Sequence, residues 1–211
     1  MIMATLAIGE DFKKALRPAL NSKAEYAARH AYTYIQGGEE FWDRDRPIAW
    51  SKVPFVLKIL GDCPDGTLIF LSDADVLITN PALKLEEHVA SLLPTKMDLL
   101  MCVDACGNLN SGNMLMRNGP WLRDFWRRIG EQRELTYHIW WENAAIIKLL
   151  QSVPSDLERT EITEDCKRFN AYIQGLPGKP LWAPGDFLVH FAGVYNLNRM
   201  IELQKTILSK L

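Results

Sequence analysis

The sequence lacks several features that define large functional classes. No apolar run approaches the ~20 residues that a helix needs to cross a bilayer. The formal charge is -2, so the chain has no excess of positive charge of the kind that attracts nucleic acid. There is also no glycine-rich phosphate loop after the first predicted strand, which counts against a phosphatase or a nucleotidyltransferase. We therefore expect no membrane span and no nucleic-acid partner.

Cysteine is scarce and scattered. The four cysteines form no pair separated by two residues, so we expect reduced thiols in a cytosolic-type compartment and no zinc site. The apolar residues 1–8 lack a basic leading region and a cleavage-like end, and are interpreted as a strand rather than a signal peptide. These observations predict a soluble, cytoplasmic protein.

The chain has enough apolar residues for a substantial core. It contains 211 residues, of which 48% are hydrophobic, and shows no internal repeat, low-complexity segment or linker. We expect one domain over residues 1–211, with a nucleotide-binding half (1–104) and an acceptor-side half (105–211). The first elements alternate between strand and helix, which predicts an α/β fold with a mostly parallel central sheet flanked by helices.

Hydrophobic spacing and turn residues divide the chain into expected elements. Strands are predicted at residues 4–8, 31–36, 67–71, 76–78, 98–103, 112–117, 169–173 and 187–191. Helices are predicted at 11–20, 22–30, 48–60, 120–129, 137–150 and 195–211, with a short irregular helix between 83 and 93. In this scheme Pro18 bends or ends the first helix, and residues 105–111 form a polar loop.

Two acids follow the central apolar run at residues 67–71. That run does not alternate, so we predict a strand buried on both faces, with Asp73 and Asp75 at its carboxyl end, where open α/β sheets bind ligands. If the chain stays extended there, the two carboxylates share a face and suit Mn²⁺ or Mg²⁺. The simpler interpretation is a polar turn, in which Asp is common anyway.

Other polar residues are compatible with a structural or a functional role. His190 lies in an apolar strand, where a histidine is usually a core residue but is also a common metal ligand. Lys52, at the start of a helix, is either a solvated charge or a cation beside a diphosphate. Glu142 and Asn143 either belong to the exposed face of a helix or are polar groups that would face the reacting carbon of a sugar substrate. Seven tryptophans are a high count, and an excess often lines a ligand cleft.

Four segments, taken in order, resemble a known family. They are Trp50-Ser51-Lys52, residues 71–81 around Asp73 and Asp75, residues 110–118 with Trp121, and residues 185–193 around His190. Together they resemble GT-A-fold glycosyltransferases that use nucleotide sugars, especially the galactomannan galactosyltransferase and xyloglucan xylosyltransferase family. The resemblance covers nearly the whole chain, and the opening residues also look like glycosyltransferases of chlorella viruses that decorate a capsid protein.

The resemblance implies a set of site residues. Asp75 and His190 would bind Mn²⁺ or Mg²⁺, and Asp73 would bind the metal or the donor ribose. The nucleotide of a UDP-sugar would contact Thr5, Leu6, Ala7 and Lys52. Substrate contacts are assigned to Asp104, Asn110, Ser111, Gly112, Trp141 and Gly193, and catalytic roles to Glu142 and Asn143.

The chain departs from the family pattern in three places. The family has an acid and a glutamine where this chain has Glu142-Asn143, and it has a lysine shortly after the histidine motif where this chain has residues 194–198. Golgi members carry an N-terminal membrane anchor, and from residues 1–211 we expect none. We therefore expect a soluble protein, in the host cytoplasm if it is viral, and the chain is compatible with one piece of a longer protein.

The predicted function is transfer of a sugar from a UDP-sugar to a glycan or glycoprotein acceptor, with retention of anomeric configuration as the resemblance implies. The departing phosphate oxygen would then take the acceptor proton. Two other classes stay open: a metal-dependent phosphatase or nucleotidyltransferase, and a non-catalytic carbohydrate-binding module built on tryptophans. A protein that glycosylates itself, as glycogenin does, is a narrower variant of the first hypothesis.

Overall fold

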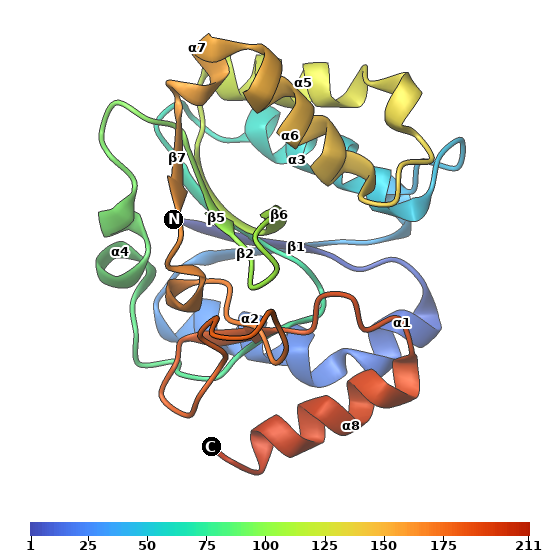
Figure 1. Cartoon of the computed structure of the whole chain (residues 1–211), viewed down its shortest axis with the longest axis vertical. Helices are drawn as coiled ribbons and strands as arrows, with labels where there is room; N and C mark the ends of the chain where they lie inside the picture. Colours follow the sequence, from blue (N-terminus) through green and yellow to red (C-terminus); the bar gives the residue numbers. More distant parts are fainter.

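A six-stranded sheet forms the centre of the computed structural model, which describes residues 1–211 (Figure 1). Five of its strands run parallel to one another, and only β6 is antiparallel to its neighbours. The predicted α/β architecture with a mostly parallel sheet is therefore confirmed. The strand order is β2 (Thr33–Gly37), β1 (Ile2–Leu6), β3 (Leu68–Ser72), β6 (Leu109–Arg117), β5 (Leu99–Val103) and β7 (Thr160–Thr163).

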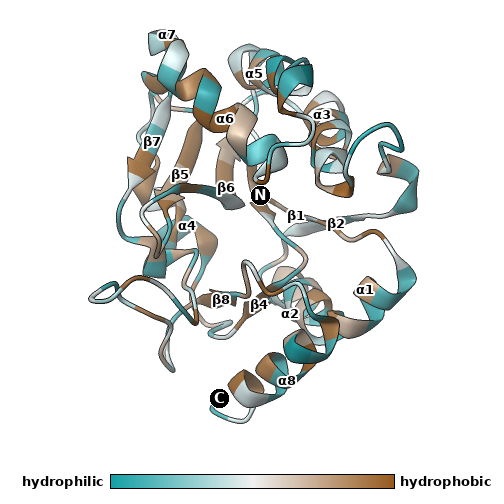
Figure 2. Cartoon of the chain, turned by 45° about the vertical axis from the view of Figure 1, so that its right-hand side comes forward, coloured by the Kyte–Doolittle hydropathy of each residue, from teal (hydrophilic) through white to brown (hydrophobic).

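Helices cover both faces of the sheet (Figures 1 and 2). One face carries α3 (Lys52–Asp62), α5 (Pro120–Gly130), α6 (Trp141–Ser152) and the short α7 (Pro154–Leu157). The other carries α1 (Glu10–Ala15), α2 (Arg17–Arg29), α4 (Leu85–His88) and α8 (Leu197–Leu208). Short 3-10 helices lie at Glu39–Phe41, Ile48–Ser51, Ala90–Leu92, Arg133–Leu135 and Cys166–Arg168.

Strand β3 separates two apolar cores. Ile69 and Leu71 pack with residues of α3, α5 and α6, whereas Phe70 points to the opposite face and packs with residues of α2 and α4. All three side chains are almost completely buried. This explains why the β3 segment is apolar at successive positions rather than alternating, as the sequence indicates.

A second sheet of two short strands completes the fold. Strand β4 (Val76–Ile78) pairs antiparallel with β8 (Leu188–His190), with Val76 opposite His190. Leu77 and Val189 are buried together with Phe191 and Ile207 in a separate small core. This pairing joins the segment after β3 to the end of the chain, and it brings the acidic motif beside the histidine.

The break between the first two helices lies earlier than predicted. Helix α1 ends at Ala15 and α2 runs without interruption from Arg17 to Arg29, so the expected boundary near residue 21 is wrong. The cause is Pro18, which lies in the first turn of α2. There its missing N–H costs nothing, so the proline starts a helix instead of ending one.

Two other segments differ from the prediction. Strand β6 begins at Leu109, so Asn110 and Ser111 lie on a strand and not in the expected loop. No strand forms at residues 169–173, where Tyr172 makes only an isolated bridge to His190, and the edge strand β7 was not predicted. In each case the pairing depends on distant partners that local sequence does not reveal.

No helix of the fold combines the length and apolar character needed to cross a bilayer.

Candidate metal and donor site

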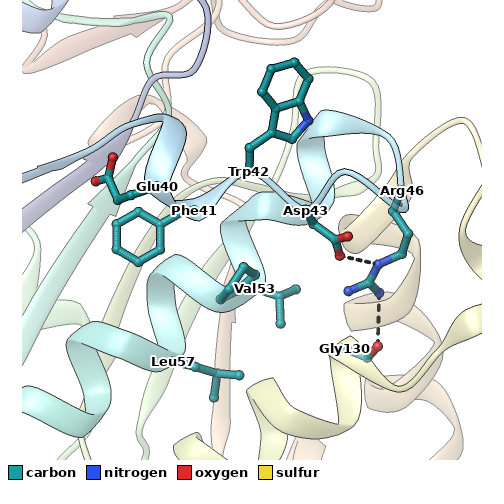
Figure 3. A pocket seen from close by; sticks show the side chains of 9 residues that line it. Glu40, Phe41, Trp42, Asp43, Arg46, Val53, Leu57 and Gly130 are labelled. Atoms are coloured by element: carbon teal, nitrogen blue, oxygen red, sulfur yellow. Dashed lines mark hydrogen bonds and ion pairs between the residues drawn. The ribbon is translucent and has the colours of Figure 1, made fainter.

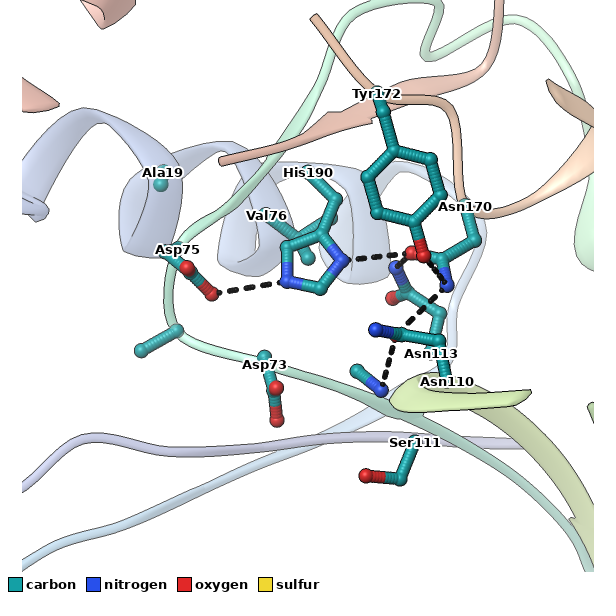
Figure 4. A network of polar contacts seen from close by, with 12 residues as sticks. Ala19, Asp73, Asp75, Val76, Asn110, Ser111, Asn113, Asn170, Tyr172 and His190 are labelled. Carbon is teal, nitrogen blue, oxygen red and sulfur yellow. Dashed lines mark hydrogen bonds and ion pairs between the residues drawn. The ribbon is translucent and has the colours of Figure 1, made fainter. Parts of the chain in front are cut away.

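Asp73, Asp75 and His190 converge at the carboxyl end of β3. One ligand atom from each lies within 4.8 Å of the other two, and His190 Nε2 is 3.4 Å from Asp75 Oδ1 (Figure 4). Two carboxylates and one imidazole form a donor set that suits Mn²⁺ or Mg²⁺ and leaves coordination positions for phosphate oxygens. The residues therefore fit the predicted cation.

The convergence arises from a turn and not from an extended chain. Residues 74 and 75 form a turn between β3 and β4, and the Val76 N–H donates to the Asp73 carbonyl at 3.2 Å. The chain is therefore not extended at this point, and the two carboxylates come to the same site through the turn. Pairing between β4 and β8 then places His190 beside the turn, since the Phe191 N–H donates to the Asp75 carbonyl at 3.1 Å.

Lys52 links Asp73 to Glu142. Its Nζ lies 2.8 Å from Asp73 Oδ1 and 2.8 Å from Glu142 Oε1, and it donates to the Ser111 carbonyl at 3.3 Å. Ser111 Oγ donates to Glu142 Oε1 at 3.2 Å. Lys52 and Glu142 are nearly buried, so the interpretation of either as a solvated surface charge is wrong. This cluster connects α3, α6 and β6 to the acidic turn.

A second lysine lies beneath the same turn. Lys23 of α2 is fully buried, and its Nζ donates to the carbonyls of Ala74 and Val76, the second at 2.5 Å. These two residues flank Asp75. The contacts therefore hold the backbone of the acidic turn, while the Asp75 carboxylate lies 3.4 Å from His190 Nε2.

The two lysines have opposite pKa shifts. Burial lowers the pKa of Lys23 to about 7, against the smaller opposing effects of Asp75 and Asp73, which it does not contact directly. Burial also disfavours the charged form of Lys52, but the adjacent Asp73 and Glu142 outweigh it and raise the Lys52 pKa above its ordinary value. Burial disfavours the Asp75 carboxylate, yet His190 and Lys23 lower its pKa overall.

His190 is held by polar contacts on its far side. Its Nδ1 lies 2.8 Å from Asn170 Oδ1, and Asn170 also contacts Asn113, Asn110 and Tyr172 (Figure 4). A Cβ atom on Gly112 would lie 2.2 Å from His190 Cε1, so the imidazole fits only because residue 112 is glycine. The predicted residues Asn110 and Gly112 thus lie beside the histidine, where both shape its surroundings.

The residues expected to hold the nucleotide lie at the end of the first strand. Thr5 and Leu6 are the last two residues of β1, and Ala7 packs with Ala74 of the acidic turn. Thr5 is fully buried and its Oγ1 has no hydrogen-bond partner. The fold therefore brings this segment beside the acidic turn, and nucleotide contact by it stays a prediction.

Four predicted residues form no hydrogen bond or ion pair with the convergent ligands. Asp104 Oδ1 accepts from the Cys106 and Asn108 N–H groups and so closes the turn between β5 and β6. Asn143 Nδ2 donates to the Leu109 carbonyl, which joins α6 to β6. Trp141 starts α6 with φ 46°, and Gly193 has φ 77°. A positive φ is costly for tryptophan and not for glycine, so backbone strain is stored next to Glu142.

The tryptophans divide between core and surface. Trp50 and Trp126 are completely buried, whereas Trp42 and Trp140 are exposed. Trp42 lines a cavity of about 450 Å³ with Phe41, Arg46 and Gly130, between the 39–46 segment and α3 (Figure 3). None of the convergent ligands lines this cavity. The excess of tryptophan therefore does not by itself mark the site.

Sequence reasoning missed two residues that support the site. Lys23 occupies a core-facing position of α2 at helical spacing from Ala19 and Ala27, and a lysine in such a position is a detectable signal. Asn170 follows the Cys166–Arg168 turn in a segment without regular structure. No local pattern distinguishes it from an ordinary loop asparagine.

Comparison with known sequences supports the predicted class. Residues 3–105 match the galactosyl transferase GMA12/MNN10 family. An uncharacterized alpha-1,2-galactosyltransferase of Schizosaccharomyces pombe is 25% identical over 85% of this chain and 56% of its own length. A probable alpha-1,2-galactosyltransferase of the same organism is 23% identical over 88% of this chain and 62% of its own length. The chain thus spans only about 56–62% of these relatives.

Solved structures show the same fold. A glycosyltransferase involved in the glycosylation of the major capsid of PBCV-1 matches with a TM-score of 0.74 and 14% identity, over 98% of this chain and 100% of that one. Galactosyltransferase LgtC, solved with donor and acceptor sugar analogs, matches with a TM-score of 0.56 and 13% identity, over 98% and 96%. The fold is the GT-A fold. This is the fold that the resemblance of the four motifs implied, and the family match over residues 3–105 agrees with that resemblance.

Gly112→Ala tests the packing of the histidine. The new Cβ would overlap the imidazole, so we expect a loss of about 1–3 kcal/mol in unfolding free energy and about tenfold or weaker Mn²⁺ binding. Urea denaturation and isothermal titration with MnCl₂ measure both. In the control Gly61→Ala, in α3, the added Cβ meets no atom within 4 Å, and neither quantity should fall. Equal Mn²⁺ affinity in the Gly112 variant would contradict this packing argument.

Lys23→Met tests the pKa of the buried lysine. The folded protein releases this proton near pH 7 and the unfolded chain near 10.5. Between these values the unfolded state binds more protons, so the lysine's contribution to stability rises with pH. We expect the unfolding free energy of the parent relative to Lys23→Met to increase by up to about 1.4 kcal/mol per pH unit. Urea denaturation at pH 7, 8 and 9 checks this, and a difference independent of pH would refute the shift.

Proposed function

We propose that this chain transfers a sugar from a UDP-sugar to a glycan acceptor, with Mn²⁺ or Mg²⁺ bound by Asp73, Asp75 and His190. The supporting observation is the convergence of these three side chains, from two distant segments, at the carboxyl edge of the sheet. This is where α/β folds bind their ligands. The adjacent end of β1 offers a place for the uracil, as the family resemblance implies.

The proposed reaction breaks the bond between the anomeric carbon and the diphosphate. A bound divalent cation would act there as a Lewis acid that stabilises the charge developing on the leaving diphosphate. The chain's own residues prepare this position. Lys23 and the β4–β8 pairing hold the acidic turn, and Lys52 fixes the Asp73 carboxylate at 2.8 Å. Little rearrangement of the ligands is then needed when the donor binds.

Glu142 is the proposed partner of the sugar. Its carboxylate is joined to Asp73 through Lys52, so it belongs to the same polar cluster as the metal ligands. A carboxylate beside the anomeric carbon stabilises the positive charge that the sugar gains as the bond breaks. Retention of configuration would need no strong base, because the departing phosphate oxygen can accept the proton of the acceptor hydroxyl.

The names of the relatives favour a hexose donor. Three matched proteins are named uncharacterized or probable alpha-1,2-galactosyltransferases, and a fourth is named a probable alpha-1,6-mannosyltransferase. UDP-galactose is therefore the first donor to test, followed by UDP-glucose, UDP-xylose and GDP-mannose. Each would be incubated with the protein and Mn²⁺ and scored for donor hydrolysis. Consumption of nucleoside triphosphates and not of any sugar nucleotide would refute the proposal and favour a nucleotidyltransferase.

Asp75→Asn tests the metal site. The amide keeps the size of the side chain and removes its charge, so we expect Mn²⁺-dependent UDP binding to weaken at least about 100-fold, since loss of an outer-shell partner alone costs about 10–100-fold. Isothermal titration with UDP in the presence and absence of Mn²⁺ measures this. The control Asp65→Asn removes an exposed carboxylate paired with Arg123 and should bind as the parent does. Parent-like binding by the Asp75 variant would sink the assignment.

Glu142→Gln separates chemistry from binding. Glutamine can still accept from Lys52 but carries no charge to oppose the positive sugar, so we expect kcat to fall about 100-fold while UDP–Mn²⁺ affinity stays near that of the parent. Steady-state rates of donor hydrolysis and titration with UDP give the two numbers. The surface variant Glu134→Gln, whose partner is the exposed Lys148, is the control. An unchanged kcat would remove Glu142 from the mechanism.

A further inference from the structure

Asn170 is buried directly behind the proposed metal ligand His190. It is completely inaccessible to solvent, and its Oδ1 lies 2.8 Å from His190 Nδ1 (Figure 4). The neighbouring Ala171 carbonyl accepts the His190 N–H at 2.7 Å. The same short segment therefore contacts both the backbone and the ring of the histidine.

The orientation of the Asn170 amide follows from one unambiguous donor. The backbone N–H of Gly112 lies 2.8 Å from an amide atom of Asn110, so that atom must be an oxygen. The same oxygen lies 3.0 Å from an amide atom of Asn170, which must then be the nitrogen. The remaining amide atom of Asn170 is the oxygen, and it faces His190 Nδ1. The assignment thus rests on a chain of contacts that begins at the backbone.

This orientation selects the tautomer of the histidine. An amide oxygen accepts hydrogen bonds and cannot donate, so His190 Nδ1 must carry the proton. In the neutral ring, Nε2 then has a free lone pair, and it lies 3.4 Å from Asp75 Oδ1. Two acceptor atoms that face each other at this distance repel, unless a proton or a metal ion lies between or beside them. The tautomer set by Asn170 is the one in which the imidazole is a ligand.

The ring is also confined sideways. Gly112 lies against its Cε1 edge, as the short Cβ distance at that position shows, and the Tyr172 ring centroid is 5.4 Å away. Asn170 itself is locked, since its Oδ1 also accepts from Asn113 Nδ2 at 2.8 Å and its Nδ2 contacts the Tyr172 hydroxyl at 2.6 Å. A rigid outer partner of this kind fixes the direction of a ligand lone pair.

We propose that Asn170 is a positioning residue for the metal site: its amide oxygen holds the Nδ1–H of His190 and so directs the Nε2 lone pair toward Asp75 and the cation. The role of the cation rests on the proposed function. The tautomer of His190 does not, and it is measurable in the metal-free protein.

The first experiment is long-range ¹H–¹⁵N NMR of the metal-free protein, which distinguishes a protonated ring nitrogen from a bare one. The chain has four histidines, and the His190 signal is assigned by its loss in His190→Gln. For the neutral ring we expect the parent to hold the proton on Nδ1, Asn170→Leu to lose this preference, and Asn170→Asp, which retains an acceptor oxygen, to restore it. A role in folding alone would not predict restoration by the acceptor.

The second experiment is titration of the same variants with MnCl₂ alone. We expect about tenfold weaker binding for Asn170→Leu and smaller loss for Asn170→Asp. The control Asn118→Leu removes a buried amide that bonds to the Leu60 and Cys63 carbonyls and should leave both tautomer and affinity unchanged. If Asn170→Leu does not fold, the tautomer of the parent carries the test, because a neutral ring with its proton on Nε2 overturns the role of Asn170.

The outcomes separate this inference from the proposed function. A parent protein with its proton on Nε2, or an Asn170→Leu variant with the parent's tautomer and Mn²⁺ affinity, would overturn the positioning role while metal-dependent UDP binding still stood. A parent that binds neither Mn²⁺ nor Mg²⁺ would overturn the proposed function and the metal role of Asn170, although the tautomer would still be as stated.

Discussion

The pairing of β4 with β8 is the constraint on which the candidate site depends. It joins segments more than a hundred residues apart and places Val76 opposite His190, one residue from Asp75. Neither strand is long enough to be stable alone, since each has three residues. Their stability comes from burial of Leu77, Val189 and Phe191 against α2 and α8. The ligand geometry is therefore maintained by apolar packing beneath it rather than by the ligands themselves.

Charge balance is the second requirement of this arrangement. Three carboxylates lie close together at the site, and in the absence of a cation their mutual repulsion would separate them. Lys52 bridges Asp73 and Glu142 and so removes most of this repulsion on one side. Asp75 has no such direct partner apart from His190, and Lys23 contacts the backbone around it, not its carboxylate. The acid that faces the histidine is therefore the one without a directly bonded lysine, and this asymmetry leaves room for a metal ion there.

The sequence predicted the elements whose patterns are local and failed where distant contacts decide. Strand β3 and helices α3 and α5 follow from apolar runs and from helical spacing, and all three occur near the expected residues. Pro18 was misplaced because a proline early in a helix and a proline that ends one look alike in sequence. Strand β7 and the absence of a strand at 169–173 depend on which partner is available at the sheet edge.

The candidate site shows the same division between local and distant information. Asp73, Asp75 and His190 were predicted because two acids follow a buried strand at the edge where α/β sheets bind ligands, and because the acidic and histidine segments resemble the motifs of a known family. Asn170 was not predicted, because an asparagine in a loop is common. Its contact with His190 forms only in the folded chain, where β6, β8 and the 170–172 segment meet. A ligand is recognised by its chemistry, whereas the group that orients it is recognised only by its position. The part of a site most open to sequence reasoning is therefore the part that touches the substrate, and the surrounding shell requires the fold.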